Sequence, residues 1–262
     1  MQSFQAIETF LGSLIAVFPR ISVLFAVLPF LPQSIPQLVI RAGLALSIAV
    51  FFQPISVGWA GWTKLDNMSL LLFALKEAAI GGAIGLCLGA VWHAATSAGA
   101  VIDTVAGTAN GNLLDPVTNQ EQGMWAASIG VVASTLIIVF GGLQLVVASL
   151  VWSYAAFPID QWLVPSASSA LNLGIWLSSY SLSLAMMIAA PFLIVLGLLD
   201  ITFGFLARNV QQFSGSPVIA PIKAMMTIVL VILGLQALAD LILSQQFAIE
   251  ATLRRLLGVF SQ

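Results

Sequence analysis

The chain has 262 residues, of which 60% are hydrophobic and 7% are charged, whereas soluble domains are about 45–50% apolar and about 25% charged. So few charges could not cover a water-facing surface, which excludes a conventional soluble enzyme and a disordered chain. Eight Lys and Arg against ten Asp and Glu provide no basic footprint for nucleic-acid phosphates. The composition therefore predicts an all-α membrane or membrane-complex protein, built as a single domain over residues 1–262.

Long apolar stretches follow one another along the chain, and six of them predict helices. They are Phe10–Pro29, Leu38–Phe52, Leu70–Thr96, Ala126–Trp152, Leu173–Leu199 and Pro221–Leu243. Pro19-Arg20 interrupts the first stretch, and the second is short. A last stretch, Phe247–Phe260, carries Glu250, Arg254 and Arg255 and predicts a separate amphipathic helix at the C-terminus.

The basic residues of the connecting segments give no membrane orientation. With six spans and the N-terminus inside, three basic residues lie inside and three outside. The inside set is Lys64, Arg254 and Arg255, and the outside set is Arg41, Arg208 and Lys223. This tie indicates that the helices do not all cross the bilayer as simple hairpins.

Glycines recur at every fourth position in Leu70–Thr96, at Gly81, Gly85 and Gly89. Four residues rotate a helix by about 40° beyond one full turn, so these glycines share a face, with Glu77 one step before them. Because glycines let another backbone approach closely, we expect a contact face, either a generic packing groove or a tight interface with a charged end. Lys76 is rotated by about 100° from Glu77, and we expect the two not to pair.

Other ionisable residues stand in apolar surroundings, where they are costly and usually face protein or water. We interpret five as structural charges: Lys76, Asp103, Asp200, Arg208 and Lys223. His93 has no carboxylate three or four residues away, which favours a structural histidine over a proton relay. An intramembrane aspartyl protease would need two facing carboxylates that share a proton, and the contexts of Asp103 and Asp200 do not resemble the Gly-x-Gly-Asp motif.

The segment Ser97–Gly123 is the longest polar interruption of the chain. Its glycine and asparagine residues allow non-helical backbone, and Asp115-Pro116 would end the excursion. Such backbone at membrane depth must be buried in protein or line a water-filled path, so the segment is either an exposed connector or a pore loop with an apolar stopper. The predicted pore-loop residues are Gly107, Asn110, Gly111, Asn112, Leu113, Leu114, Asp115 and Pro116.

Three sequence blocks occur in the order of a known family. The first is Lys76-Glu77-Ala78-Ala79-Ile80-Gly81 with Gly85; the second is Gly99-Ala100-Val101-Ile102-Asp103 with Gly107 and Asp115-Pro116; the third is Arg208-Asn209 with Pro221-Ile222-Lys223. From about Phe10 to Leu243, their order and spacing resemble the type III secretion export-apparatus family, called SctT in injectisomes and FliR in flagella.

The chain departs from the family pattern in two places. The family usually reads Pro-Gln-Leu-Asn where this chain has Gln211-Gln212-Phe213-Ser214, and Thr104-Val105-Ala106 stands where a polar run is usual. In contrast, Trp152-Ser153-Tyr154 with Phe157-Pro158 is similar to the injectisome branch.

The resemblance implies a non-enzymatic subunit of kinked helical hairpins in the bacterial inner membrane, with no cofactor and no metal. It implies partners as well: two smaller helical export-gate subunits, the export-gate switch protein, unfolded secreted proteins in transit and membrane lipid, but no nucleic acid. The family assembly is largely raised out of the bilayer plane, and its loop at about Gly107–Pro116 helps to plug a pore. The alternative is a polytopic secondary transporter, which would need discontinuous helices around a midplane site.

Overall fold

The structure is a computed structural model that describes residues 2–29, 37–56, 66–108, 113–114, 121–160, 167–209 and 219–259. Its helices are α1 (Gln2–Val27), α2 (Gln37–Phe52), the short 3-10 helix η1 (Gln53–Ser56), α3 (Asn67–Ala106), α4 (Met124–Val139), α5 (Gly142–Ala156), α6 (Ala167–Asn209) and α7 (Ile219–Val259). Two strands of two residues each, β1 (Leu113–Leu114) and β2 (Glu121–Gln122), pair in antiparallel fashion. The expected all-α class is confirmed.

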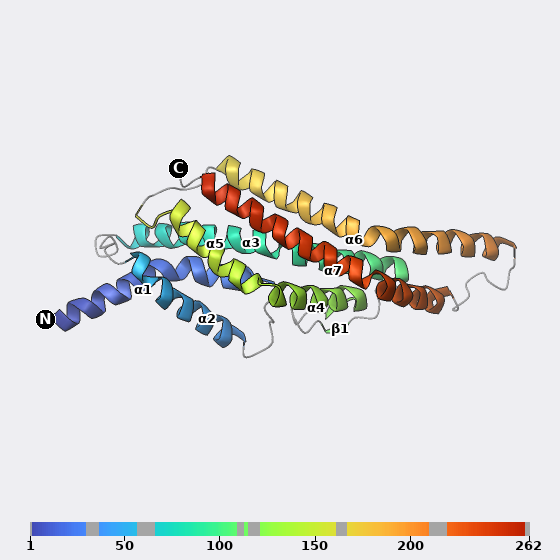
Figure 1. Ribbon diagram of the computed structural model, residues 1–262, viewed down its shortest axis with the longest axis horizontal. Coiled ribbons are helices and arrows are strands. Elements are labelled where there is room, and N and C mark those ends of the chain that lie inside the picture. The colour runs from blue at the N-terminus through green and yellow to red at the C-terminus, as the bar shows by residue number, and fades with distance from the viewer. Residues whose placement is uncertain are drawn as a thin grey trace.

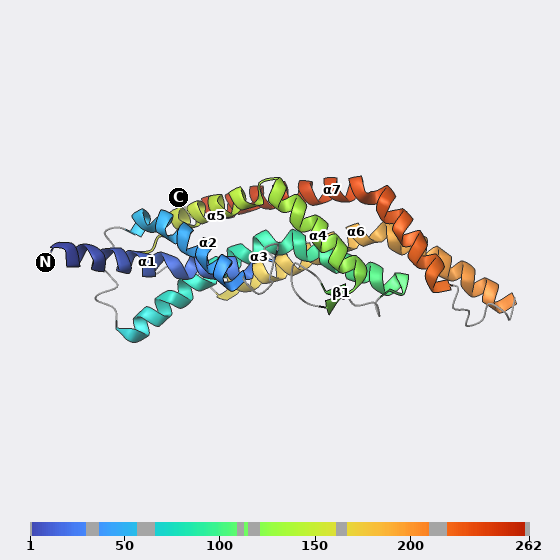
Figure 2. The same cartoon turned by 90° about the horizontal axis from the view of Figure 1, so that it is seen from below.

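The helices form an elongated bundle around α3 (Figures 1 and 2). Helix α3 packs against α1, α4 and α6, while α7 contacts α3, α4 and α5. Helices α6 and α7 make a long hairpin whose far end extends beyond the other helices (Figure 1). The start of α1 lies at one end of the molecule, and the end of α6 and the start of α7 lie at the opposite end (Figure 1).

Helix α3 is longer than the sequence predicted. The prediction ended its apolar stretch at Thr96 and treated Ser97 as the start of the polar interruption, but the helix continues for ten more residues to Ala106. These residues are mostly small or aliphatic, so they bury a face and tolerate helical backbone. Gly107 ends the helix with a φ of 75° in the left-handed region, a conformation that glycine adopts without steric cost.

The predicted fourth stretch is broken into α4 and α5, which bend by 65°. The bend falls at Phe140 and Gly141, and Gly141 has a φ of 92°. A left-handed residue cannot continue a right-handed helix. Apolar composition alone could not reveal this bend, because both halves are strongly apolar.

Helix α7 merges the last two predicted stretches. The segment Leu243–Phe247 was expected to separate two helices, yet α7 runs without interruption from Ile219 to Val259. Its Ser-Gln-Gln sequence contains no glycine or proline, so nothing in it terminates a helix. The prediction of a separate C-terminal amphipathic helix is therefore wrong.

Four described helices, α1, α3, α6 and α7, are long and apolar enough to cross a membrane, and α4 with α5 would make a fifth, broken span. Helix α2 falls below this length. At 1.5 Å per residue, α6 with its 43 residues is about 65 Å long, about twice the hydrocarbon thickness of a bilayer. Proline stands inside two helices, at Pro19 of α1 and Pro191 of α6.

Candidate functional site: a buried charge cluster and the loop after α3

The glycine face of α3 lies directly against α1. A Cβ atom added to Gly81 would overlap the backbone carbonyl of Arg20, and one added to Gly85 would lie 3.1 Å from the carbonyl oxygen of Leu24. At Gly89 the same atom would lie 2.8 Å from the ring of Pro29. These glycines therefore allow the two helix backbones to come into contact.

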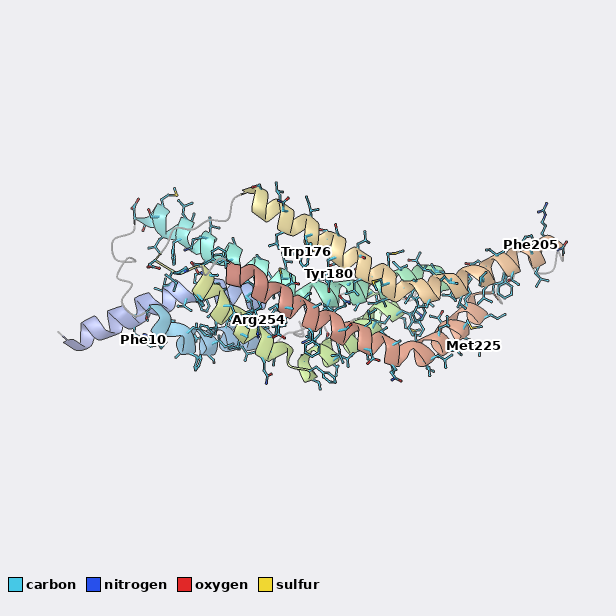
Figure 3. The ribbon with its side chains drawn as sticks, turned by 45° about the horizontal axis from the view of Figure 1, so that its top comes forward. Phe10, Trp176, Tyr180, Phe205, Met225 and Arg254 are labelled. Atoms are coloured by element: carbon cyan, nitrogen blue, oxygen red, sulfur yellow. The ribbon has the colours of Figure 1, made fainter. Side chains whose placement is uncertain are left out.

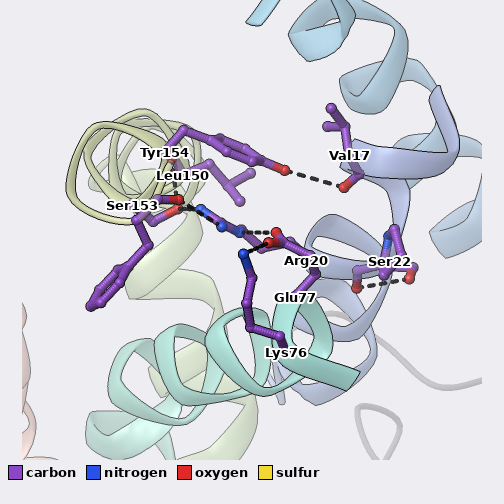
Figure 4. Close-up of polar contacts among 10 residues, drawn as sticks. Val17, Arg20, Ser22, Lys76, Glu77, Leu150, Ser153 and Tyr154 are labelled. Atoms are coloured by element: carbon purple, nitrogen blue, oxygen red, sulfur yellow. Dashed lines mark hydrogen bonds and ion pairs between the residues drawn. The ribbon is translucent and has the colours of Figure 1, made fainter. Parts of the chain in front are cut away.

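Next to this face, three charged side chains are buried together (Figure 4). The Arg20 guanidinium of α1 donates from Nε to Glu77 Oε2 of α3 at 2.8 Å, and neither side chain is exposed. Lys76 Nζ lies 3.0 Å from Glu77 Oε1. The expectation that Lys76 and Glu77 would not pair is therefore wrong, because the long lysine side chain turns back toward its neighbour on α3.

Helix α5 completes the cluster. Arg20 donates from its terminal nitrogens to Ser153 Oγ at 3.2 Å and to the carbonyl of Phe157 at 2.9 Å, and its guanidinium lies 4.1 Å from the ring centroid of Tyr154. The Tyr154 hydroxyl in turn donates to the carbonyl of Val17 at 3.1 Å. The cluster therefore joins α1, α3 and α5 through polar contacts inside an apolar bundle.

Sequence reasoning identified only part of this cluster. Arg20 was noted as an interruption of the first apolar stretch and Glu77 as the charged end of the glycine face, but Ser153 and Tyr154 were noted only for their resemblance to the injectisome branch. Arg20 and Ser153 are separated by 133 positions, so no local spacing connects them. The available signal was the Ser-Tyr pair directly after the apolar stretch Ala126–Trp152, which contains no charged residue.

The predicted pore loop, Gly107–Pro116, directly follows α3, and α4 begins further along the chain at Met124. Thr108 follows Gly107, and its N–H donates to the carbonyl of Asp103 at 3.0 Å, as in the Schellman ending of a helix. Strand β1 then pairs Leu113 with Gln122 and Leu114 with Glu121. The other predicted loop residues lie outside the described residues: Asn110, Gly111, Asn112, Asp115 and Pro116.

Asp103 lies on the last turn of α3 and is buried, with 2% of its surface exposed. Its carboxylate accepts hydrogen bonds from the backbone N–H groups of Trp125 and Ala126 at 3.1 and 3.0 Å, and from the Thr108 hydroxyl at 2.8 Å. The first turn of a helix has N–H groups without helical partners and a partial positive charge, so a carboxylate stabilises it. Asp103 therefore caps α4 from a different helix.

The remaining structural charges lie at the far ends of the helices. Lys223 of α7 forms an ion pair with Asp200 of α6 and donates to the carbonyl of Val105 at 3.3 Å, so it links the hairpin to the end of α3. Arg208 is exposed on the last turn of α6. Asp200 and Asp103 each have partners of their own, which is not the arrangement of two carboxylates that share a proton.

His93 and Cys87 both lie on α3. The His93 ring contacts Trp92 edge to face on α3, and Cys87 is buried as a free thiol. Within the described ranges, no group of three or more His, Cys, Asp and Glu side chains is placed to hold a metal ion.

Comparison with known proteins assigns the chain to a family over most of its length. The family of bacterial export proteins, family 1, matches residues 11–248. The chain belongs to this family. The match runs from within α1 to within α7 and includes the charge cluster and both ends of the loop.

Three relatives share about a quarter of their sequence with this chain. The surface presentation of antigens protein SpaR of Shigella flexneri is 25% identical over 87% of each chain. The Yop proteins translocation protein T of Yersinia pestis is 26% identical over 84% of this chain and 85% of its own. The flagellar biosynthetic protein FliR of Bacillus subtilis is 25% identical over 93% of each. The expected resemblance to the SctT/FliR family is therefore confirmed, and with it the assignment to a multi-pass protein of the bacterial inner membrane.

Proposed function

We propose that this chain is a core subunit of a type III export gate, and that it helps to form and seal the pore through which unfolded proteins leave the bacterial cytoplasm. Its family membership supports a place in the export apparatus. The observation that carries the sealing role is the attachment of both ends of the loop between α3 and α4 to Asp103.

One buried carboxylate, Asp103, bonds residues at both ends of this loop. Between these ends, strands β1 and β2 pair with each other. Leu113 and Leu114 form one of the two strands. An apolar pair held at a fixed place can close a narrow aqueous path by dewetting, which supports the assignment of Gly107–Pro116 as the stopper of the resting pore.

The mechanism is passive conduction and sealing, with no catalytic chemistry in this subunit. The charge cluster at Arg20 is satisfied inside the bundle, so its charges hold helices together and do not line a binding site. A secondary transporter would need a substrate site at the middle of the membrane, and family membership supports the export gate over this alternative.

The partners of this subunit are two smaller helical export-gate subunits and the export-gate switch protein. Helices α6 and α7 support this proposal, because they expose large apolar side chains along most of their length, from Trp176 near the start of α6 to Phe205 and Met225 at the far end of the hairpin (Figure 3). Membrane lipid would cover what the protein partners leave open, and unfolded secreted proteins pass through the pore.

We assign the subunit to the injectisome branch of the family. The names of injectisome proteins predominate among its relatives. The segment that resembles this branch, Trp152 to Pro158, supplies Ser153, Tyr154 and the Phe157 carbonyl to the buried cluster. The residues that resemble the injectisome branch therefore include those that hold α5 against α1 through Arg20.

Deletion of Asn110–Leu114 tests the sealing role. The assembled complex should form at the normal yield, while ion leakage through the inner membrane should rise several-fold, because the stopper is lost. Leu113→Ser with Leu114→Ser should leak in the same way, whereas Asn110→Ser with Asn112→Ser is the matched control and should stay sealed. Normal assembly with wild-type conductance in the deletion variant would show that the loop is only a connector.

A further inference from the structure

The base of the loop between α3 and α4 is held by a single side chain. Asp103 lies before the loop, yet its carboxylate reaches partners on both sides of it: the Thr108 hydroxyl at the start, and the N–H groups of Trp125 and Ala126 at the end. It is 2% exposed, so water does not compete strongly for these hydrogen bonds. Both ends of the loop are thus tied to one group.

The glycines around Asp103 make this contact possible. A Cβ atom on Gly123 would overlap the Asp103 carboxyl group, and one on Gly99 would lie 2.5 Å from the Cα atom of Ala126. Gly123 occupies the N-cap position of α4 with extended backbone, φ −60° and ψ 155°. Serine, threonine, aspartate and asparagine are usual there, because their side chains bond the first free N–H groups of a helix. Because Gly123 has no side chain, the carboxylate of Asp103, 20 positions earlier in the sequence, caps α4 instead.

A capping residue next to α4 would serve the helix equally well, but it would leave the start of the loop unattached. We propose that Asp103 is the positioning residue of the loop: by bonding Thr108 and the start of α4 with one carboxylate, it fixes the distance between the two ends of the loop and thereby the place where Leu113 and Leu114 are presented. This inference rests on the proposed sealing function for its physiological meaning, although the positioning itself is measurable without it.

Asp103 both caps α4 and positions the loop, and the two roles can be separated by placing a capping side chain at another residue. Asp103→Ala abolishes the cap and the positioning together. Asp103→Ala combined with Gly123→Ser restores a side-chain cap at the N-cap position, whose backbone already suits it, and the space for the serine is vacated by the lost carboxyl group. In this double variant α4 is capped again, but Thr108 and α4 no longer share a partner. Asp240→Asn, an exposed carboxylate on α7, is the matched control for loss of one negative charge.

The experiment uses the assembled complex with its two smaller subunits, spin-labelled at Ala100→Cys on α3 and at Leu114→Cys in the loop; Cys87 is buried and stays in place. Wild type and Asp240→Asn should give a narrow distribution of the distance between the labels. Asp103→Ala should broaden it and lower the thermal unfolding temperature. The double variant should recover the unfolding temperature but keep the broad distribution.

Ion leakage is measured on unlabelled complexes in the same membranes. We expect leakage to rise several-fold in Asp103→Ala and in the double variant. A narrow, wild-type distribution in the double variant would overturn the proposal and leave Asp103 as a helix cap only. If the distribution broadens but neither this variant nor the Asn110–Leu114 deletion leaks, the positioning role stands and the sealing function of the loop is wrong.

Discussion

At the scale of single residues, Glu77 links two buried cations. Its carboxylate forms ion pairs with Arg20 and with Lys76. Breaking a buried ion pair by removing one partner is strongly destabilising, because the other charge stays buried and unpaired. The three side chains should therefore differ sharply in their tolerance to substitution.

We predict that Glu77→Gln is the most damaging neutral substitution in the cluster. It leaves two buried cations near each other and should lower the free energy of unfolding by about 3–5 kcal/mol. Lys76→Met keeps a similar shape and leaves Arg20 paired with Glu77, so it should cost less stability than Glu77→Gln. Thermal unfolding and yield of the purified complex measure both; equal losses in the two variants would contradict the role of Glu77 as the link between the two cations.

At the scale of helices and loops, the sequence predicted what depends on local pattern. Glycine spacing placed Gly81, Gly85 and Gly89 on one face, and this face contacts α1. The end of α3, the bend between α4 and α5 and the continuity of α7 were not predicted, because hydropathy alone does not show where helical backbone stops or continues. The partners of Asp103 and Arg20 come from other helices, and a single sequence does not show which helices are neighbours.

Neighbouring glycines of α3 allow a matched test of the close contact with α1. A Cβ atom on Gly81 would overlap the Arg20 backbone, whereas one on Gly82 would lie 3.5 Å from Val23 Cγ1, an ordinary contact. Gly81→Ala should cost about 1–3 kcal/mol, as overpacking does, and should disturb Arg20. Gly82→Ala should be neutral or stabilise the helix by up to about 1 kcal/mol. Similar unfolding temperatures for the two variants would show that α1 can move away from α3 without cost.

At the scale of the whole molecule, the other helices leave much of the α6–α7 hairpin uncovered. Only 11% of the most apolar 18-residue segment of α7 is buried, and the side chains of Ile232 and Leu233 are 68% and 76% exposed. Helices of this length exceed the hydrocarbon thickness about twofold, so lipid alone would not cover them along a simple span. This geometry favours coverage of the hairpin by other protein chains over part of its length.

Lipid and protein surroundings respond differently to a larger side chain, and Ile232 is well placed to distinguish them. Lipid chains rearrange around added bulk, whereas a close-packed protein contact is overpacked and loses about 1–3 kcal/mol. We therefore expect Ile232→Trp to reduce co-purification of the two smaller subunits with this chain, while Ile232→Val, which shortens the same side chain, keeps it near the wild-type level. The measurement is the ratio of the three subunits after affinity purification through this chain. An unchanged ratio in Ile232→Trp, with normal insertion in the membrane, would mean that lipid covers this face of α7 and that the partner subunits bind elsewhere.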